Sequence, residues 1–211
     1  MQKILIATTN KGKLGEIKEY LSDLAGLPAD RQVEFVSLSD VGITQDVEEN
    51  GTTYEENSQK KAIEYARISG LPAISDDGGL EIEALGGAPG IDSKFFGGKE
   101  GRDEDIVIKM MEVAKTIPDN KRGAKFVAVV SFALPTGEVW SERADVALEI
   151  AKKPLLKLLK GFPYRSFLIV PQIGKYYHES ELTPTERKEY NHRYKALQQL
   201  KITIRDVLQL L

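Results

Sequence analysis

The sequence of 211 residues contains no cysteine and only two histidines, His178 and His192. The absence of cysteine excludes disulfides, thiolate zinc sites and cysteine nucleophiles. Two histidines also argue against a histidine-rich metal centre. Any metal site must therefore use oxygen ligands, which favours the hard ions Mg²⁺, Mn²⁺ and Ca²⁺.

Long apolar runs and an excess of basic charge are also lacking. The N-terminal run MQKILIATTN is too short for the apolar core of a signal peptide, and no later stretch approaches a membrane span. Lysine and arginine number 29 against 32 acidic residues, for a formal net charge of -3, so no global basic field favours nucleic acid. We therefore expect a soluble, cytoplasmic protein with one substantial core that binds neither nucleic acid nor a membrane.

The order of the apolar patterns predicts an α/β fold. Short runs rich in β-branched residues predict strands at 3–7, 33–38, 73–75, 125–134 and 138–150. Helical periodicity or capping signals predict helices at about 14–24, 54–69, 102–115 and 183–200, with a last amphipathic piece at 203–211. We interpret residues 1–211 as a single domain with a mixed sheet flanked by helices, with a hairpin formed around the PTG turn at 135–137.

The segment TTNKGK, residues 8–13, lies between a predicted strand and a predicted helix. This arrangement directs backbone N–H groups and a helix N-terminus at an anion, so Thr8, Asn10 and Lys13 could surround a phosphate. The same pattern is typical of an ordinary cap in which Thr9 or Asn10 starts the helix. The segment alone leaves both interpretations open.

The segment SDDGG, residues 75–79, places Asp76 and Asp77 at the end of a predicted short strand. Ligands of open α/β sheets bind at this edge, and a carboxylate there can hold Mg²⁺ and act as a general base for water. Glycines after the carboxylates let the backbone approach a bound group closely. The composition is equally typical of a surface turn.

Two further segments are rich in charged residues, but neither indicates a function by itself. The segment EENGTTYEEN, residues 48–57, is rich in glutamates that suit the first turn of a helix, and Lys60 and Lys61 after it are predicted to be solvated. Near the C-terminus, Arg187, Lys188, His192 and Arg193 could grip a nucleotide or simply cover a charged helix surface.

Together these segments resemble the inosine triphosphate pyrophosphatase family, also called dITP/XTP pyrophosphatases, from residue 3 to about residue 200. ATTNKGKLGEI (7–17) is similar to A-T-x-N-x-x-K-x-x-E-I, and EENGTTYEENSQKKA (48–62) is similar to E-x-x-G-x-T-F-x-E-N-A-x-x-K-A. SDDGGLEIEALGGAPGIDS (75–93) resembles A-D-D-S-G-L-x-V-x-A-L-G-G-x-P-G-x-Y-S. Three ordered motifs with matching separations are far more specific than any one of them.

The resemblance implies an elongated α/β fold with a cleft between two lobes, and a homodimer. It implies Mg²⁺-dependent hydrolysis of ITP, dITP and XTP to the nucleoside monophosphate and pyrophosphate. Asp77 would be the general base and, with Glu48, would hold the metal, while Gly78 would contact the nucleotide. The triphosphate would be bound by Thr8, Thr9, Asn10, Lys11, Gly12 and Lys13. Glu56 matches a motif position without an assigned role, and Asp76 is expected to be a supporting carboxylate.

The C-terminal half departs from the family pattern. The base-binding G-F-G-Y-D-P-x-F corresponds to GFPYRSFL (161–168), which keeps Phe162 and Tyr164 but replaces a glycine with Pro163 and the aspartate with Arg165. Proline fixes φ and removes an N–H, and arginine supplies only donors.

The motif E-K-x-x-I-S-H-R corresponds to ERKEYNHR (186–193), with Arg187, or Lys188 beside it, for the lysine and with His192 and Arg193 retained. The resemblance therefore assigns substrate binding to Phe162, Tyr164, Arg165, Arg187, His192 and Arg193 and leaves the preferred base open. A shifted specificity, a Maf-like nucleotide pyrophosphatase and a nucleotide-binding protein without turnover are the alternatives.

Overall fold

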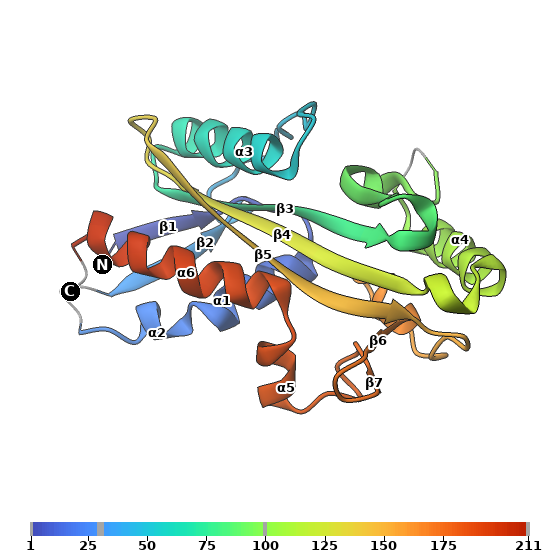
Figure 1. The fold of residues 1–211 in the computed structure, drawn as a ribbon. Coiled ribbons are helices and arrows are strands. Elements are labelled where there is room, and N and C mark those ends of the chain that lie inside the picture. The colour runs from blue at the N-terminus through green and yellow to red at the C-terminus, as the bar shows by residue number, and fades with distance from the viewer. Residues whose placement is uncertain (1, 29–31, 99–100, 210–211) are drawn as a thin grey trace. The chain divides into compact units, whose positions relative to one another are not determined.

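A computed structural model describes residues 2–28, 32–98 and 101–209 (Figure 1). The chain divides into two compact units. The first unit comprises residues 1–77, 128–144 and 193–211, and the second comprises residues 78–127 and 145–192. This division agrees with the two predicted lobes, whereas the cleft between them and the single-domain organisation over residues 1–211 stay predictions.

The described strands form a mixed seven-stranded sheet in the order β2-β1-β3-β4-β5-β6-β7, which confirms the predicted fold class. β1 is parallel to β2 and to β3, whereas β6 is antiparallel to β5 and to β7. The strands are β1 (Gln2–Ile6), β2 (Val33–Ser37), β3 (Ala73–Ile82), β4 (Gly123–Ala133), β5 (Val139–Ile150), β6 (Leu168–Val170) and β7 (Lys175–Tyr176).

In the first unit, helices cover both faces of the sheet (Figure 1). On one face, Tyr65 of α3 is buried in the same cluster as Leu5 of β1. On the other face, Ile17 and Leu197, from α1 and α6, are buried with Ile74 of β3. The helices of this unit are α1 (Lys11–Tyr20), α2 (Ser22–Ala25), α3 (Tyr54–Ser69) and α6 (His192–Val207).

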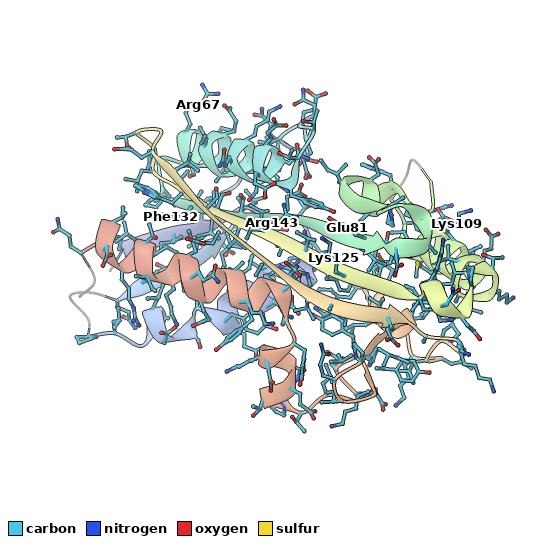
Figure 2. All side chains as sticks on the ribbon, viewed as in Figure 1. Arg67, Glu81, Lys109, Lys125, Phe132 and Arg143 are labelled. Carbon is cyan, nitrogen blue, oxygen red and sulfur yellow. The ribbon has the colours of Figure 1, made fainter. Side chains whose placement is uncertain are left out.

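The second unit has its own core, in which Leu80, Met110, Phe126 and Phe167 are buried. At its surface, Lys125 of β4 pairs with Glu81 of β3 at 3.1 Å (Figure 2). Its helices are η1 (Glu83–Leu85), η2 (Gly90–Phe95), α4 (Asp103–Thr116), η3 (Asp119–Lys121), η4 (Arg165–Phe167) and α5 (Pro184–Glu189). No helix in the described part of the chain has the length and apolar character needed to span a bilayer.

The prediction of a short strand at 73–75 was wrong, because β3 continues to Ile82. Gly79 lies inside this strand and does not form a turn. A Cβ atom at Gly79 would lie 2.1 Å from the carbonyl oxygen of Gly90 and 2.4 Å from Ser93 Oγ. Ser93 Oγ in turn accepts a hydrogen bond from the N–H of Leu80 at 2.8 Å. The second glycine of the SDDGG segment therefore permits a close approach of two backbone segments.

The prediction of one helix from 183 to 200 was also wrong. The predicted capping box between Thr183 and Glu186 is present, but α5 ends at Glu189. The N–H of Asn191 bonds the carbonyl of Lys188 at 3.3 Å, so the last turn is tightened and the helix stops. α6 then continues without a break from His192 to Val207, across the predicted gap before residue 203.

Candidate active site

The loop between β1 and α1 places the predicted phosphate-binding residues at the N-terminus of α1. Asn10 is the N-cap, and its Oδ1 accepts hydrogen bonds from the N–H groups of Gly12 (2.8 Å) and Lys13 (3.1 Å). Thr8 Oγ1 accepts a bond from the N–H of Asn10 at 3.2 Å. Asn10 is therefore a helix cap, one of the two interpretations of this segment. Thr9 and Lys11 lie beside it with exposed side chains.

Asp76 and Asp77 lie on β3 just beyond the end of β1. Ile6, the last residue of β1, pairs with Ile74, so both aspartates follow the point where the parallel pairing stops. Side chains alternate between the faces of a strand. Asp76 therefore shares the α1 and α6 face with Ile74, whereas Asp77 faces α3.

Asp76 is held in two ion pairs. Its Oδ2 lies 2.7 Å from Lys13 Nζ, and Arg193 donates from Nε to Oδ1 at 2.7 Å and from Nη2 to Oδ2 at 3.2 Å. Burial alone would raise the pKa of Asp76, but Arg193 and Lys13 hold it well below its usual value. Asp76 therefore stays ionised and is a poor base for a proton of water.

Asp77 differs from Asp76 in having one carboxylate oxygen without a hydrogen-bond partner among the described residues. Its Oδ1 lies 3.7 Å from Lys61 Nζ, and its buried Oδ2 has no hydrogen-bond partner among the described residues. Burial raises the pKa of Asp77 above its usual value, against the opposing charges of Lys61 and Lys13. A buried acceptor left unpaired costs about 1–3 kcal/mol, so its presence points to a ligand that completes it.

Lys61 of α3 joins Asp77 to the loop before the helix. Its Nζ lies 2.8 Å from Glu49 Oε2 and 2.9 Å from the carbonyl oxygen of Asp76. Burial alone would lower the pKa of Lys61, but the carboxylates of Asp77 and Glu49 outweigh it and raise the pKa. Lys61 therefore stays charged and keeps the two acidic side chains near one another.

Oxygen ligands for a metal are few but suitable. Among the described residues, no three or more His, Cys, Asp or Glu side chains gather as a metal site. Mg²⁺ does not need such a site, because it is usually bound by one or two carboxylates together with waters and substrate phosphates. The unpaired Oδ2 of Asp77 fits this mode. Glu48 is exposed, and its Oε2 accepts a long bond of 3.4 Å from Asn50.

In the second unit, the segment 161–168 folds around Arg165. The guanidinium lies over the ring of Phe162, 3.7 Å from its centroid, and 5.4 Å from the ring centroid of Tyr177. Tyr164 is buried, and its hydroxyl donates to the carbonyl oxygen of Ser93 at 2.5 Å. Burial raises the pKa of Tyr164, so this hydroxyl remains a donor.

The other predicted site residues of the C-terminal half lie in different surroundings. His192 is buried in the second unit, stacked on Phe126 at 4.8 Å between ring centroids, with Nδ1 3.4 Å from the hydroxyl of Tyr177. Arg187 lies on α5, and its buried Nε has no hydrogen-bond partner among the described residues. Arg193 belongs to the first unit, where Asp76 and Glu16 hold its guanidinium.

Comparison with known protein families shows which proteins this chain is related to. Residues 4–203 match the model of the Ham1 family. The chain belongs to the Ham1 family. It is 34% identical over 216 residues to the dITP/XTP pyrophosphatase of Clostridium perfringens, covering 99% of this chain and 100% of the relative. It is 37% identical over 210 residues to that of Yersinia pestis, covering 98% and 100%.

Solved Ham1 structures share the whole fold. A HAM1 protein from Coxiella burnetii aligns with a TM-score of 0.79 at 32% identity, over 98% of this chain and 100% of that one. The Staphylococcus aureus Ham1 protein aligns with a TM-score of 0.77 at 29% identity, over 97% and 99%. The predicted family and its α/β fold are thereby confirmed.

Glu56, to which the sequence assigned no role, has a structural role in this Ham1 protein. Glu56 Oε2 accepts bonds from the N–H of Thr52 at 2.6 Å and from its hydroxyl at 2.9 Å. Asn57 Oδ1 accepts from the N–H of Gly51 at 2.8 Å. Both side chains thus fold the turn that leads into α3 and follows Glu49.

Lys61 is the residue of this Ham1 site that sequence reasoning missed. It was predicted to be solvated, but its side chain is only 11% exposed and pairs with Glu49 and Asp77. Two signals were available. The motif that residues 48–62 resemble has a lysine at this position, and Lys61 lies one turn after Asn57 on the buried face of α3. The predicted ligand and substrate roles of the other residues stay predictions.

Proposed function

We propose that this Ham1 protein is a nucleoside triphosphate pyrophosphatase that hydrolyses ITP, dITP and XTP to the monophosphate and pyrophosphate. The family and the names of its relatives support the reaction class. The observation that carries the proposal is Asp77, a buried carboxylate with a raised pKa and an unpaired oxygen beside Lys61. Such a group suits general-base catalysis, because its pKa is closer to neutral than that of an exposed aspartate.

In the proposed reaction, Asp77 accepts a proton from the attacking water. The water oxygen bonds to the α-phosphorus, the bond to the bridging oxygen breaks, and its electron pair leaves with pyrophosphate. Lys13 and Lys61 offset negative charge near Asp77, since both act on its titration. The first turn of α1, with residues 8–13, is proposed to bind the triphosphate.

We propose Mg²⁺ as the metal, held by Asp77 and Glu48. When bound, it would neutralise phosphate charge and polarise water. Glu49 is a less suitable ligand because its Oε2 already pairs with Lys61 at 2.8 Å. The donor chemistry supports a hard cation, since the acidic side chains at this site offer oxygen alone.

Base recognition is proposed for residues of the second unit and for Arg193. These residues are Phe162, Tyr164, Arg165, Arg187 and His192. A shifted base preference is the second candidate, because Arg165 replaces the family's aspartate and offers only hydrogen-bond donors. A cytoplasmic homodimer is proposed from the resemblance.

Release of pyrophosphate in the presence of Mg²⁺ tests the reaction. The substrates are ITP, XTP, dITP, the common purine triphosphates and the pyrimidine triphosphates. We expect the highest kcat/KM on one of the first three, and no release from any triphosphate would contradict the proposal. Asp77→Asn should lower kcat by on the order of 10²-fold or more while sparing nucleotide binding. Asp206→Asn, an exposed aspartate on α6, is the matched control and should leave kcat unchanged.

A further inference from the structure

The loop that follows β5 combines leucines with lysines (Figure 1). Residues 152–160 of this loop read KKPLLKLLK. From residue 150 to residue 178 the chain has five lysines, one arginine and no aspartate or glutamate, although its overall net charge is -3. The second unit therefore contains a strongly basic segment in a chain that is acidic as a whole.

Two leucines of this loop are exposed to solvent. Leu156 is 91% exposed, more than any other large hydrophobic residue in the described part of the chain, and Leu158 is 63% exposed. Single apolar side chains on a surface are common and need no explanation. Here two of them lie on either side of Lys157, so they form an apolar patch in basic surroundings.

Hydrogen bonds fix the backbone around Leu156, although residues 152–160 form no helix or strand. The N–H of Leu155 donates to the carbonyl oxygen of Ser166 at 2.8 Å. The hydroxyl of Ser166 in turn donates to the carbonyl oxygen of Lys157. Because both neighbours of Leu156 are held by one residue, its exposure follows from a fixed backbone.

Three of the four lysines in the loop keep their charge available to an anion. Lys152 is neutralised, since it pairs with Asp119 at 2.7 Å. Lys157 has a loose contact, 3.9 Å from Glu181, and its side chain is 60% exposed. The other two lysines of residues 152–160 are exposed and have no acidic partner within 4 Å among the described residues.

We propose that residues 152–160 dock the protein reversibly on an anionic lipid surface. Leu156 and Leu158 would enter the boundary between headgroups and acyl chains, and the lysines would contact the headgroups. Anionic bilayers attract basic segments, and burial of apolar side chains at the interface adds affinity. Because Leu156 projects from the surface instead of lining a groove, it suits insertion into a fluid interface.

A second copy of the chain is a less suitable occupant of this loop. A two-fold interface places the same patch of both copies together, so the lysines of the two loops would repel one another. The expectation that the protein binds no membrane rested on its net charge and on the length of its apolar runs, and neither describes a local surface. The docking inference goes beyond the proposed hydrolysis and does not depend on it.

Co-sedimentation of the full chain with vesicles, in the absence of nucleotide, tests the proposal. We expect binding to vesicles of phosphatidylcholine and phosphatidylglycerol that weakens as salt is added, and little binding to phosphatidylcholine alone. Leu156→Ser combined with Leu158→Ser should lower the partition coefficient by on the order of 10-fold or more. The control, Ile108→Ser combined with Ile202→Ser, removes two side chains that are 62% and 66% exposed and should leave it unchanged.

A second pair of variants tests the role of charge. Lys153→Gln combined with Lys157→Gln should lower binding to the anionic vesicles by on the order of 10-fold or more. The control is Lys115→Gln combined with Lys195→Gln, which makes the same change in net charge at exposed residues of α4 and α6. It should have little effect. All these substitutions are at exposed side chains, and far-UV circular dichroism checks that each variant is folded.

Three results would overturn the proposal. The first is a wild-type protein that does not bind the anionic vesicles. The second is an equal loss of binding in the loop variants and in their controls, which would mean that no particular surface is used. The third is a shift from dimer to monomer in the double leucine variant, measured by sedimentation velocity without vesicles, since it would show that a second copy covers the loop.

Discussion

Replacing Gly79 with alanine should strongly destabilise the protein. The added Cβ would lie 2.1 Å from the carbonyl oxygen of Gly90 and 2.4 Å from Ser93 Oγ, and neither a backbone carbonyl nor a buried hydroxyl can move away freely. Overpacking of this kind costs about 1–3 kcal/mol. If Ser93 is displaced, the buried N–H of Leu80 loses its acceptor, which costs about 1–3 kcal/mol more. We expect the free energy of unfolding to fall by roughly 2–6 kcal/mol from the sum of these two effects.

Urea unfolding followed by far-UV circular dichroism measures this loss. The fluorescence of Trp140, the single tryptophan, reports on the first unit in the same titration. Gly15→Ala is the matched control. Apart from the adjacent backbone of α1, no atom of the described residues lies within 4 Å of its added Cβ, and alanine is favoured over glycine in a helix by about 1 kcal/mol. A Gly79→Ala protein within about 0.5 kcal/mol of the wild type would refute the close approach, because that is the range of neutral surface changes.

Two further predictions concern the second unit. Arg165→Asp should change the ratio of kcat/KM for ITP and XTP by about 10-fold or more, because it turns a donor into an acceptor. Arg165→Asp also removes the stacking of the guanidinium on Phe162, which contributes about 0.5–2 kcal/mol of stability. The control is Lys160→Asp, which makes the same charge change at an exposed residue. Burial lowers the pKa of His178, whose Nδ1 accepts from the N–H of Ser180. The unfolded state therefore binds more protons, and the free energy of unfolding should fall as pH drops below about 6.5.

The outcomes that would contradict these two predictions are distinct. An unaltered ratio of ITP to XTP turnover in Arg165→Asp would mean that this position does not read the base. For His178, urea unfolding between about pH 7 and pH 5 is compared with that of His178→Gln, which cannot titrate in this range. Equal pH dependence of the two proteins would show that His178 is not responsible.

Elements with a long local pattern could be predicted from the sequence, whereas those fixed by distant partners could not. The α3 helix was predicted from Tyr54 to Ser69, which are its observed ends, because its caps and periodicity are all local. β3 was predicted to stop at Ser75, since Asp-Asp-Gly-Gly is unfavourable in a strand. It continues because β4 pairs along it, Arg193 binds the carboxylate of Asp76, and Lys61 lies beside that of Asp77.

The site residues could be predicted by type, but their pairing could not. Asp77 and Lys13 follow from motifs, and the structure places Asp77 beside Lys61 and Lys13 beside Asp76. The partner of Asp76, however, is Arg193, 117 residues further along the chain. No periodicity or spacing connects two such positions, because their contact depends on α6 packing against the sheet. The same holds for Lys61, whose burial depends on the loop that carries Glu49.

The alternation of a β-strand explains why two adjacent aspartates can serve opposite purposes. On one face of β3, Asp76 meets Arg193 and Lys13, and its pKa falls well below the usual value. On the other face, Asp77 is buried beside Lys61, and burial raises its pKa. Had the pair lain in a flexible turn, water would have reached both and their pKa values would have converged. A strand is therefore the arrangement that makes one aspartate a fixed anchor for Lys13 and the other a base for the proposed hydrolysis.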